Sequence, residues 1–284
     1  NRTIDAANTT TLSVSNTVTN PAIDPATNRI ASGQNYVYDK AGNLTNDAEG
    51  REFLYDAENH QIEVKNAAQQ TIGVYEFDGE GRRVRKISST EMTVFVYNAA
   101  GKLIAEYSTQ MAQVQQVSYL TNDHLGSPRV ITNESGAVTS RQDFSAFGDE
   151  TLTVQRTQGL GYKPDELRKD YTGYEKDDET GLEFAQARYY NPKHGRFTSV
   201  DPLTASANVK DPQTFNRYSY AMNSPYKFTD PLGLISSSTG ANGHGSEPNG
   251  KKCDIICRVE MGVGSKRDLM LLQWHVANGT ALGY

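Results

Sequence analysis

A short strand-and-turn pattern that recurs between residues 36 and 98 constrains the fold of this chain more than any other feature. Alternating aromatic residues lead each time to an acidic or amide residue, at Asp39, Asp56, Asp78 and Asn98, and these positions advance by 17, 22 and 20 residues. Alternating large side chains are typical of a half-buried strand. Asp and Asn bond to their own backbone two residues on and so begin turns.

The position three residues after each turn signal favours a left-handed backbone. It holds Gly in three copies and Asn59 in the second, and both residue types accept a positive φ more readily than others. A single hairpin cannot bury its apolar face alone, so repeated hairpins stack side by side. We therefore predict an all-β fold of stacked antiparallel hairpins. A degenerate fifth copy runs from Tyr119 to Val130, and its His124 is predicted to be a turn residue rather than a catalytic one.

Composition agrees with an extended architecture and excludes several functions. Only 36% of the 284 residues are hydrophobic, which favours a shell-like shape, and the net charge of −6 argues against a dedicated nucleic-acid surface. No apolar run is long enough for a membrane helix, and no signal segment is visible. The first residue, Asn1, suggests a piece of a longer polypeptide. Cys253 and Cys257 are too few for a disulfide framework, and we predict no metal site and no cofactor.

Changes in composition divide the chain into four parts. Residues 1–35 form an edge strand and irregular lead-in, and residues 36–187 the repeat shell. Residues 188–234 are rich in aromatics and prolines and form an inward plug, and residues 235–284 are a flexible linker followed by a short, partly helical tail. An acidic cluster at 175–179 lacks the ligand spacing of a calcium loop, so we predict that it is a solvated hairpin tip.

Several motifs in the plug resemble a known family in sequence and in order. They are Arg188–Pro192, Gly195–Pro202, Asn216–Tyr220 and Asp230–Leu234, and Asp123–Ser127 precedes them. Together they resemble the RHS-repeat-associated core domain of the RHS/YD-repeat proteins, which include polymorphic toxins and insecticidal toxin-complex C proteins. The resemblance implies that the hairpins form part of a β-shell spiralling around a cavity.

The resemblance also implies a chemistry, because part of this family cleaves itself with an aspartyl protease site after an Asp-Pro-x-Gly-Leu motif. Carried onto this sequence, the catalytic carboxylates are Asp201 and Asp230, and the cleaved bond is Leu234–Ile235. Two carboxylates held close together share one proton, so that one activates water while the other polarises the carbonyl. The simpler alternative is that both Asp-Pro pairs are turns that hold the plug.

Other residues of the block would support that site. Gly233 lets the backbone lie close to the carboxylates, and Pro231 completes the motif. Val200 stands where the family often has Arg, so Arg188 or Arg196 is the candidate to take that role. The loop between the two aspartates is also longer here and contains an additional Asp211-Pro212.

The function implied by this resemblance is enclosure and release of a C-terminal toxin or effector. The expected partners are the chain's own C-terminal segment, the preceding repeats of the parent protein, a secretion machinery and an immunity protein, with no membrane span and no nucleic acid. The parent protein is expected to be secreted or displayed on a bacterial cell surface. The alternative function is a non-enzymatic surface or adhesion scaffold that binds glycans or cells.

Overall fold

The computed structural model describes residues 21–110, 117–151, 168–203, 206–207, 212–234 and 236–238. The expectations for the first 20 residues and for the linker and tail beyond 238 lie outside these ranges, as do Ile235 and Asp211.

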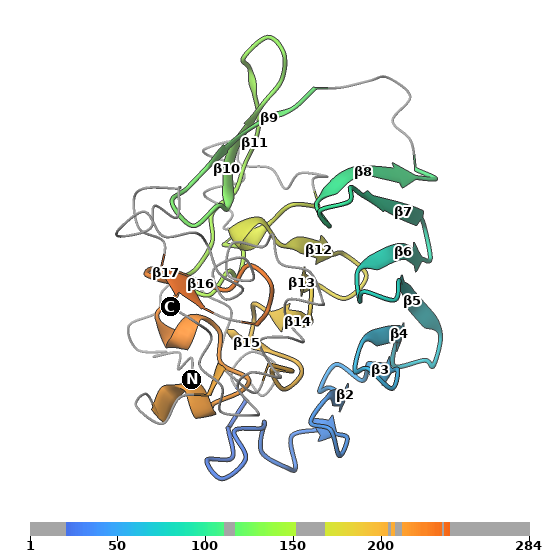
Figure 1. The fold of residues 1–284 in the computed structure, drawn as a ribbon, viewed down its shortest axis with the longest axis vertical. Coiled ribbons are helices and arrows are strands. Elements are labelled where there is room, and N and C mark those ends of the chain that lie inside the picture. The colour runs from blue at the N-terminus through green and yellow to red at the C-terminus, as the bar shows by residue number, and fades with distance from the viewer. Residues whose placement is uncertain are drawn as a thin grey trace.

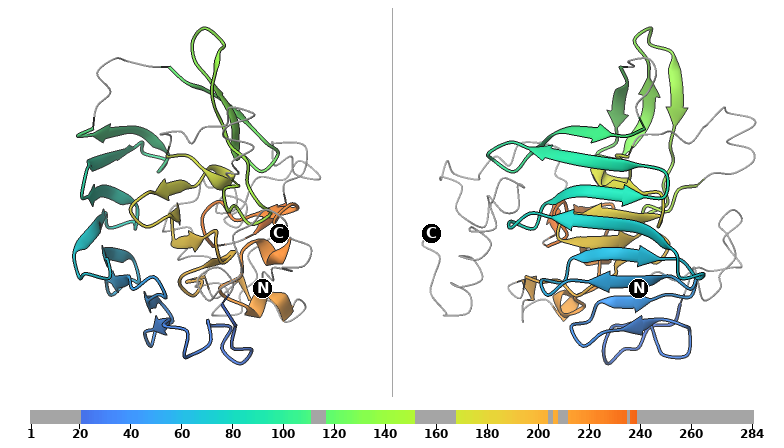
Figure 2. Two further views of the ribbon diagram at one scale, coloured as in Figure 1. Left: turned by 180° about the vertical axis from the view of Figure 1, so that it is seen from behind. Right: turned by 90° about the vertical axis from the view of Figure 1, so that its right-hand side faces the viewer.

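One curved sheet of eight antiparallel strands forms a wall along one side of the molecule (Figure 1), and its strands follow one another in chain order (Figure 2). The strands are β1 (Val37–Tyr38), β2 (Leu44–Asn46), β3 (Glu52–Tyr55), β4 (Gln61–Lys65), β5 (Thr71–Phe77), β6 (Arg83–Ser88), β7 (Met92–Tyr97) and β8 (Leu103–Ser108). Each repeat supplies consecutive hairpin strands. The prediction of stacked antiparallel hairpins is confirmed.

The turns of the wall have the predicted mechanism. In the third repeat, Oδ1 of Asp78 accepts hydrogen bonds from the backbone N–H groups of Glu80 and Arg82, at 2.9 and 3.0 Å. The same two bonds occur at Asp56 and Asn98, and in the first repeat Asp39 Oδ1 accepts from Asn43 N at 2.8 Å. Asn59 adopts φ +65° in the place of the Gly of the other copies. The turn chemistry therefore sets the register of each hairpin.

A separate three-stranded sheet, in the order β11-β10-β9, follows the wall. Its strands are β9 (Tyr119–Asn122), β10 (Pro128–Thr132) and β11 (Val138–Arg141). The turn between β9 and β10 is the fifth copy of the repeat, because Asp123 Oδ1 accepts from Leu125 N and Ser127 N at 2.9 and 3.0 Å. His124 lies in this turn, as predicted, with Nε2 3.3 Å from the carbonyl oxygen of Tyr226.

A second, smaller layer lies on the concave side of the wall (Figure 1). It consists of the sheet β12 (Glu175–Asp177), β13 (Leu182–Ala185), β14 (Arg188–Asn191) and β15 (Arg196–Phe197), the strand pair β16 (Phe228–Thr229) and β17 (Ser237–Ser238), and the short 3₁₀ turns η2 (Tyr171–Gly173), η4 (Pro212–Phe215) and η5 (Ala221–Asn223). The tight turn between β13 and β14 ends directly before residue 188, where the sequence predicted the start of the plug.

The inner sheet is buried on both faces, which explains why all four residues of β13 are inaccessible. Leu182 and Phe184 of β13 pack with Tyr189 of β14 against apolar side chains of the wall. Ala185 and Tyr190 point the other way, into an aromatic cluster built from Leu125, Tyr171, Tyr174, Phe197, Tyr220 and Ala221. Burial of both faces fixes the position of the β13–β14 hairpin between wall and plug.

Charged residues also join the inner sheet to the wall, and here one prediction is wrong. The acidic segment 175–179 is not a solvated tip, because the side chain of Asp177 is fully buried and contacts Arg83 Nη1 at 2.6 Å and Lys86 Nζ at 3.0 Å. Glu175 pairs with Arg83 Nη2 at 2.8 Å. The prediction was wrong because the partners of these acids, Arg83 and Lys86, lie on β6, about 90 residues earlier in the chain.

Candidate functional site

The Arg188 side chain brings the two predicted aspartates together. Its Nη2 lies 3.3 Å from Asp230 Oδ2 and 3.6 Å from Asp201 Oδ2, and all three residues are buried. The guanidinium also lies over the ring of Phe197, 3.7 Å from its centroid. Because Arg188 begins β14, the buried inner sheet holds the cation in place between carboxylates from two different loops.

Asp201 is held by the segment that follows β15. Its Oδ1 accepts from Leu203 N at 2.8 Å, and Ser206 Oγ donates to its Oδ2 at 2.8 Å. The backbone N–H of Asp201 donates to the carbonyl of Arg217 at 3.1 Å. Burial raises the pKa of the Asp201 carboxyl above its usual range, and the charge of Arg188 opposes part of that rise.

Asp230 is tied directly to the residue at the predicted cleavage position. Its Oδ1 accepts from Leu234 N at 2.8 Å, and its backbone carbonyl accepts from Gly233 N at 3.2 Å. Pro231, an exposed residue, occupies the second position of this turn, where its fixed φ is suited to turn geometry. The motif therefore folds back on itself and places Leu234 beside the Asp230 carboxylate.

Gly233 lies where no side chain fits. Its φ is +66°, and a Cβ at this position would be 2.7 Å from the backbone oxygen of Ala185. The carbonyl of Gly233 accepts a hydrogen bond from Arg188 Nε, and the Leu232 carbonyl accepts from Ala187 N at 3.2 Å. The same arginine that lies between the carboxylates thus holds the backbone one residue before Leu234.

The two arginines that the sequence left as alternatives have different places. Arg196 does not contact either carboxylate, since its guanidinium donates to the carbonyl of Asn28 and lies 5.0 Å from the ring centroid of Tyr218. Val200 packs against the first repeat turn, where a Cβ added to Gly42 would meet Val200 Cγ2 at 2.5 Å. Arg188 is the arginine of the site.

Two further residues hold the site and were not singled out from the sequence. The hydroxyl of Tyr174 donates to the backbone carbonyl of Asp230. Arg217 Nη2 donates to the backbone carbonyls of Asp201 and Leu203. Arg217 lies inside one of the recognised motifs, Asn216–Tyr220, so this motif could have pointed to it. No sequence motif pointed to Tyr174, because its contact joins segments 56 residues apart.

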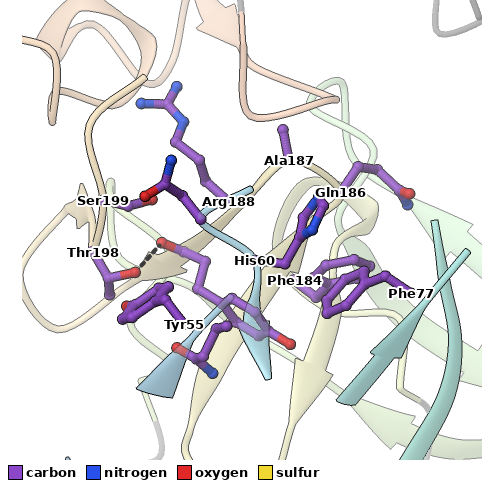
Figure 3. Close-up of a pocket in the computed structure, with 12 residues that line it drawn as sticks. Tyr55, His60, Phe77, Phe184, Gln186, Ala187, Arg188, Thr198 and Ser199 are labelled. Atoms are coloured by element: carbon purple, nitrogen blue, oxygen red, sulfur yellow. Dashed lines mark hydrogen bonds between the residues drawn. The ribbon is translucent and has the colours of Figure 1, made fainter. Parts of the chain in front are cut away.

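A small cavity lies between the wall and the β13–β14 turn, next to Arg188 (Figure 3). His60 and Phe77 stack on one side of it, with ring centroids 4.6 Å apart, and Thr198 and Ser199 lie on the other. The space open to the centre of a water molecule is about 10 Å³, which is room for about one water. Neither aspartate lines it, so this cavity is not a substrate pocket for them.

Within the residues that the structure describes, no group of three or more His, Cys, Asp or Glu side chains is arranged to hold a metal ion. No helix among them is long and apolar enough to cross a membrane.

The wall of repeat hairpins and the inner layer define a class of protein, the YD-repeat shell. Residues 26–226 match the family model described as Teneurin YD-shell, and the chain belongs to this family. The resemblance to RHS/YD-repeat proteins noted from the sequence is thereby confirmed.

A nuclease and a toxin protein are among the proteins that this chain is similar to. It is 29% identical over 215 residues to the tRNA3(Ser)-specific nuclease WapA of Bacillus spizizenii, which covers 69% of this chain and 9% of that protein. It is 31% identical over 120 residues to the toxin protein Tse5 of Pseudomonas aeruginosa, covering 42% of this chain and 8% of that one.

Solved toxin-complex structures share the fold. The structure of the Photorhabdus luminescens Tc holotoxin pore superimposes with a TM-score of 0.52 at 20% identity, covering 70% of this chain and 11% of that chain. The chain thus spans about a tenth of the length of each of these proteins.

Proposed function

We propose that this chain is the C-terminal part of an RHS-type shell that encloses a C-terminal toxin or effector and releases it by cleaving itself after Leu234. Shell membership follows from the fold and the family. The cleavage rests on one observation: Asp201, Asp230 and the Gly233 carbonyl converge on Arg188, and Leu234 N donates to Asp230.

The arrangement supplies the groups that aspartyl hydrolysis needs. A protonated carboxyl donates to the carbonyl oxygen of Leu234, and the other carboxylate takes a proton from water, whose oxygen bonds to the carbonyl carbon. Collapse of this intermediate breaks the bond to the Ile235 nitrogen, which leaves with the proton that the carboxylate took from water, and the intermediate's hydroxyl returns a proton to the other carboxylate. We assign Asp201 as the proton donor, because burial favours its neutral form.

Arg188 has two roles in this proposal. Its charge lets both carboxylates remain buried when they are ionised. Its Nε holds the Gly233 carbonyl, and so restricts the backbone that enters the cleaved bond. We therefore assign Arg188 as the positioning residue, Asp201 and Asp230 as the catalytic carboxyls, and Leu234–Ile235 as the bond that is cut.

In this proposal the shell's partners are its own C-terminal segment, from 235 on, and the preceding repeats that complete the wall. The similarity to toxin proteins also supports a secretion machinery and an immunity protein as partners of the whole protein, and a secreted or surface location for it.

The intact mass of the purified chain after incubation tests the cleavage. The wild type is expected to lose residues 235–284, and Asp230→Asn to remain whole. Asp24→Asn is the matched control, because Asp24 also precedes a proline but lies in an exposed turn far along the chain from the site; it should be cut like the wild type. A single full-length mass in all three would refute the protease assignment and favour the adhesion scaffold, for which binding of the intact chain to cells or glycans is the next measurement.

A further inference from the structure

A second group of acids lies on the face of the inner sheet that is turned away from the wall, and the site at Arg188 does not use it. Glu183, at the centre of β13, is 1% exposed, and Asp170, just before η2, is 3% exposed. The two carboxyl groups perturb each other's pKa, and a protonated Glu183 can donate a hydrogen bond to Asp170. Two carboxyls can bond in this way only while they share a proton.

One ammonium group serves this pair and a third acid. Lys176 Nζ on β12 lies 3.2 Å from Asp170 Oδ2 and 3.5 Å from Glu150 Oε2. Among the described residues, no donor outside the pair reaches Glu183 Oε2 or Asp170 Oδ1, and none reaches Glu150 Oε1. With every acid ionised, three negative charges would face one positive charge in a region shielded from water, which is strongly unfavourable.

The cluster lies where the segment of residues 117–151, which we call the hairpin module, docks on the inner sheet. Glu150 belongs to this module, while Lys176 and Glu183 belong to the sheet. Neighbouring contacts complete the junction: Tyr171 Oη donates to the Ala146 carbonyl at 2.9 Å, and Tyr190 Oη to the Phe147 carbonyl at 2.7 Å. Charge repulsion inside the cluster would therefore act on the junction itself.

We propose that the Glu183–Asp170 pair is a proton-dependent latch, which holds the hairpin module on the inner sheet while the pair keeps its proton and loosens this junction when the proton is lost. The ligand of the latch is the proton, and its sensor is a carboxylic acid rather than a histidine. The proposal does not depend on self-cleavage.

The direction of the pH effect follows from the environment. Burial raises the pKa of Glu183 well above its usual range, and the negative charge of Asp170 raises it further. Burial also raises the pKa of Asp170 and of Glu150, while Lys176 opposes both shifts. Among the described residues, Asp149 and Asp178 also act on the cluster, as does Asp177 from the opposite face of the sheet.

A carboxyl whose pKa is higher in the folded state than in the unfolded state contributes to the stability of the folded state. This contribution is complete below the ordinary pKa, and it is lost as pH rises through the folded-state pKa. The latch is therefore closed while the pH lies below the raised pKa of the pair, and it opens as the pH rises through that pKa. For each proton released when the junction opens, the equilibrium constant for opening increases up to tenfold per pH unit.

The test compares Glu183→Gln with the wild-type residue, both in an Asp230→Asn background so that the chain stays whole. Gln keeps the shape and donates to Asp170 at every pH, so amide hydrogen exchange at the junction should lose most of its pH-dependent opening. Glu134→Gln, at an exposed turn, is the matched control and should leave that dependence unchanged.

Infrared spectroscopy gives a readout that a packing role would not change. At a pH where the junction is closed, the spectrum should contain a protonated-carboxyl C=O band that disappears in Glu183→Gln. If that variant does not fold, Asp170→Asn replaces it in both measurements. Equal pH dependence of opening with and without the Glu183 carboxyl, or no such band where the junction is closed, would overturn the proposal.

Discussion

Replacement of Arg83 by Met should destabilise the protein more than almost any other change in the wall. The Arg83 side chain is fully buried, pairs with Asp177 at 2.6 Å and Glu175 at 2.8 Å, and lies 4.1 Å from the ring centroid of Phe184. Met fills a similar volume but leaves Glu175 without a cation and Asp177 with only Lys86. Removal of one partner of a buried ion pair costs about 3–5 kcal/mol.

The neighbouring residue provides the control. Arg82 directly precedes β6, its side chain is 27% exposed, and it pairs with Asp78 in its own turn. A solvent-accessible pair of this kind contributes about 0.2–1 kcal/mol, so Arg82→Met should have a small effect. Urea unfolding followed by circular dichroism, in the Asp230→Asn background, measures both free energies.

The sign of the pH dependence strengthens this test. Without Arg83, the acids Glu175 and Asp177 remain buried with less compensating charge, and the pKa of Glu175, already raised by burial, rises further because Arg83 no longer opposes that rise. The deficit of Arg83→Met should therefore shrink as pH falls and Glu175 takes up a proton. A loss below about 1 kcal/mol at neutral pH, equal to that of Arg82→Met, would refute the argument that this ionic layer holds the inner sheet to the wall.

Two further predictions concern the proposed cleavage. Gly233→Ala should slow cleavage, and it should destabilise the chain by more than the roughly 1–2 kcal/mol that a left-handed backbone costs a residue with a side chain. The additional cost arises because the new Cβ meets the Ala185 backbone. Gly136→Ala is the control: Gly136 has φ +78° and open space around it, so only the cost of the left-handed backbone applies. Equal effects of the two changes on unfolding would contradict this. If Asp201 is the proton donor, the cleavage rate should fall as pH rises through its raised pKa, and a rate that increases with pH would assign the donor role elsewhere.

The local pattern of this chain determined its wall. The Asp, Asn and Gly turn signals act within five residues of one another, and alternation of side chains acts within a strand, so both can be read without the fold. Even Asn59 at the left-handed turn position followed from the sequence. The pairing order β1 to β8 then follows, because each hairpin places consecutive strands side by side.

Tertiary structure decided everything that depends on contacts between distant segments. Val200 stands where the resemblance led us to look for a positive charge, and only the fold shows that Arg188, rather than Arg196, lies between Asp201 and Asp230. The burial of Asp177 likewise depends on a cation from β6. A local pattern specifies a turn, but the free energy of a buried charge depends on what surrounds it in space.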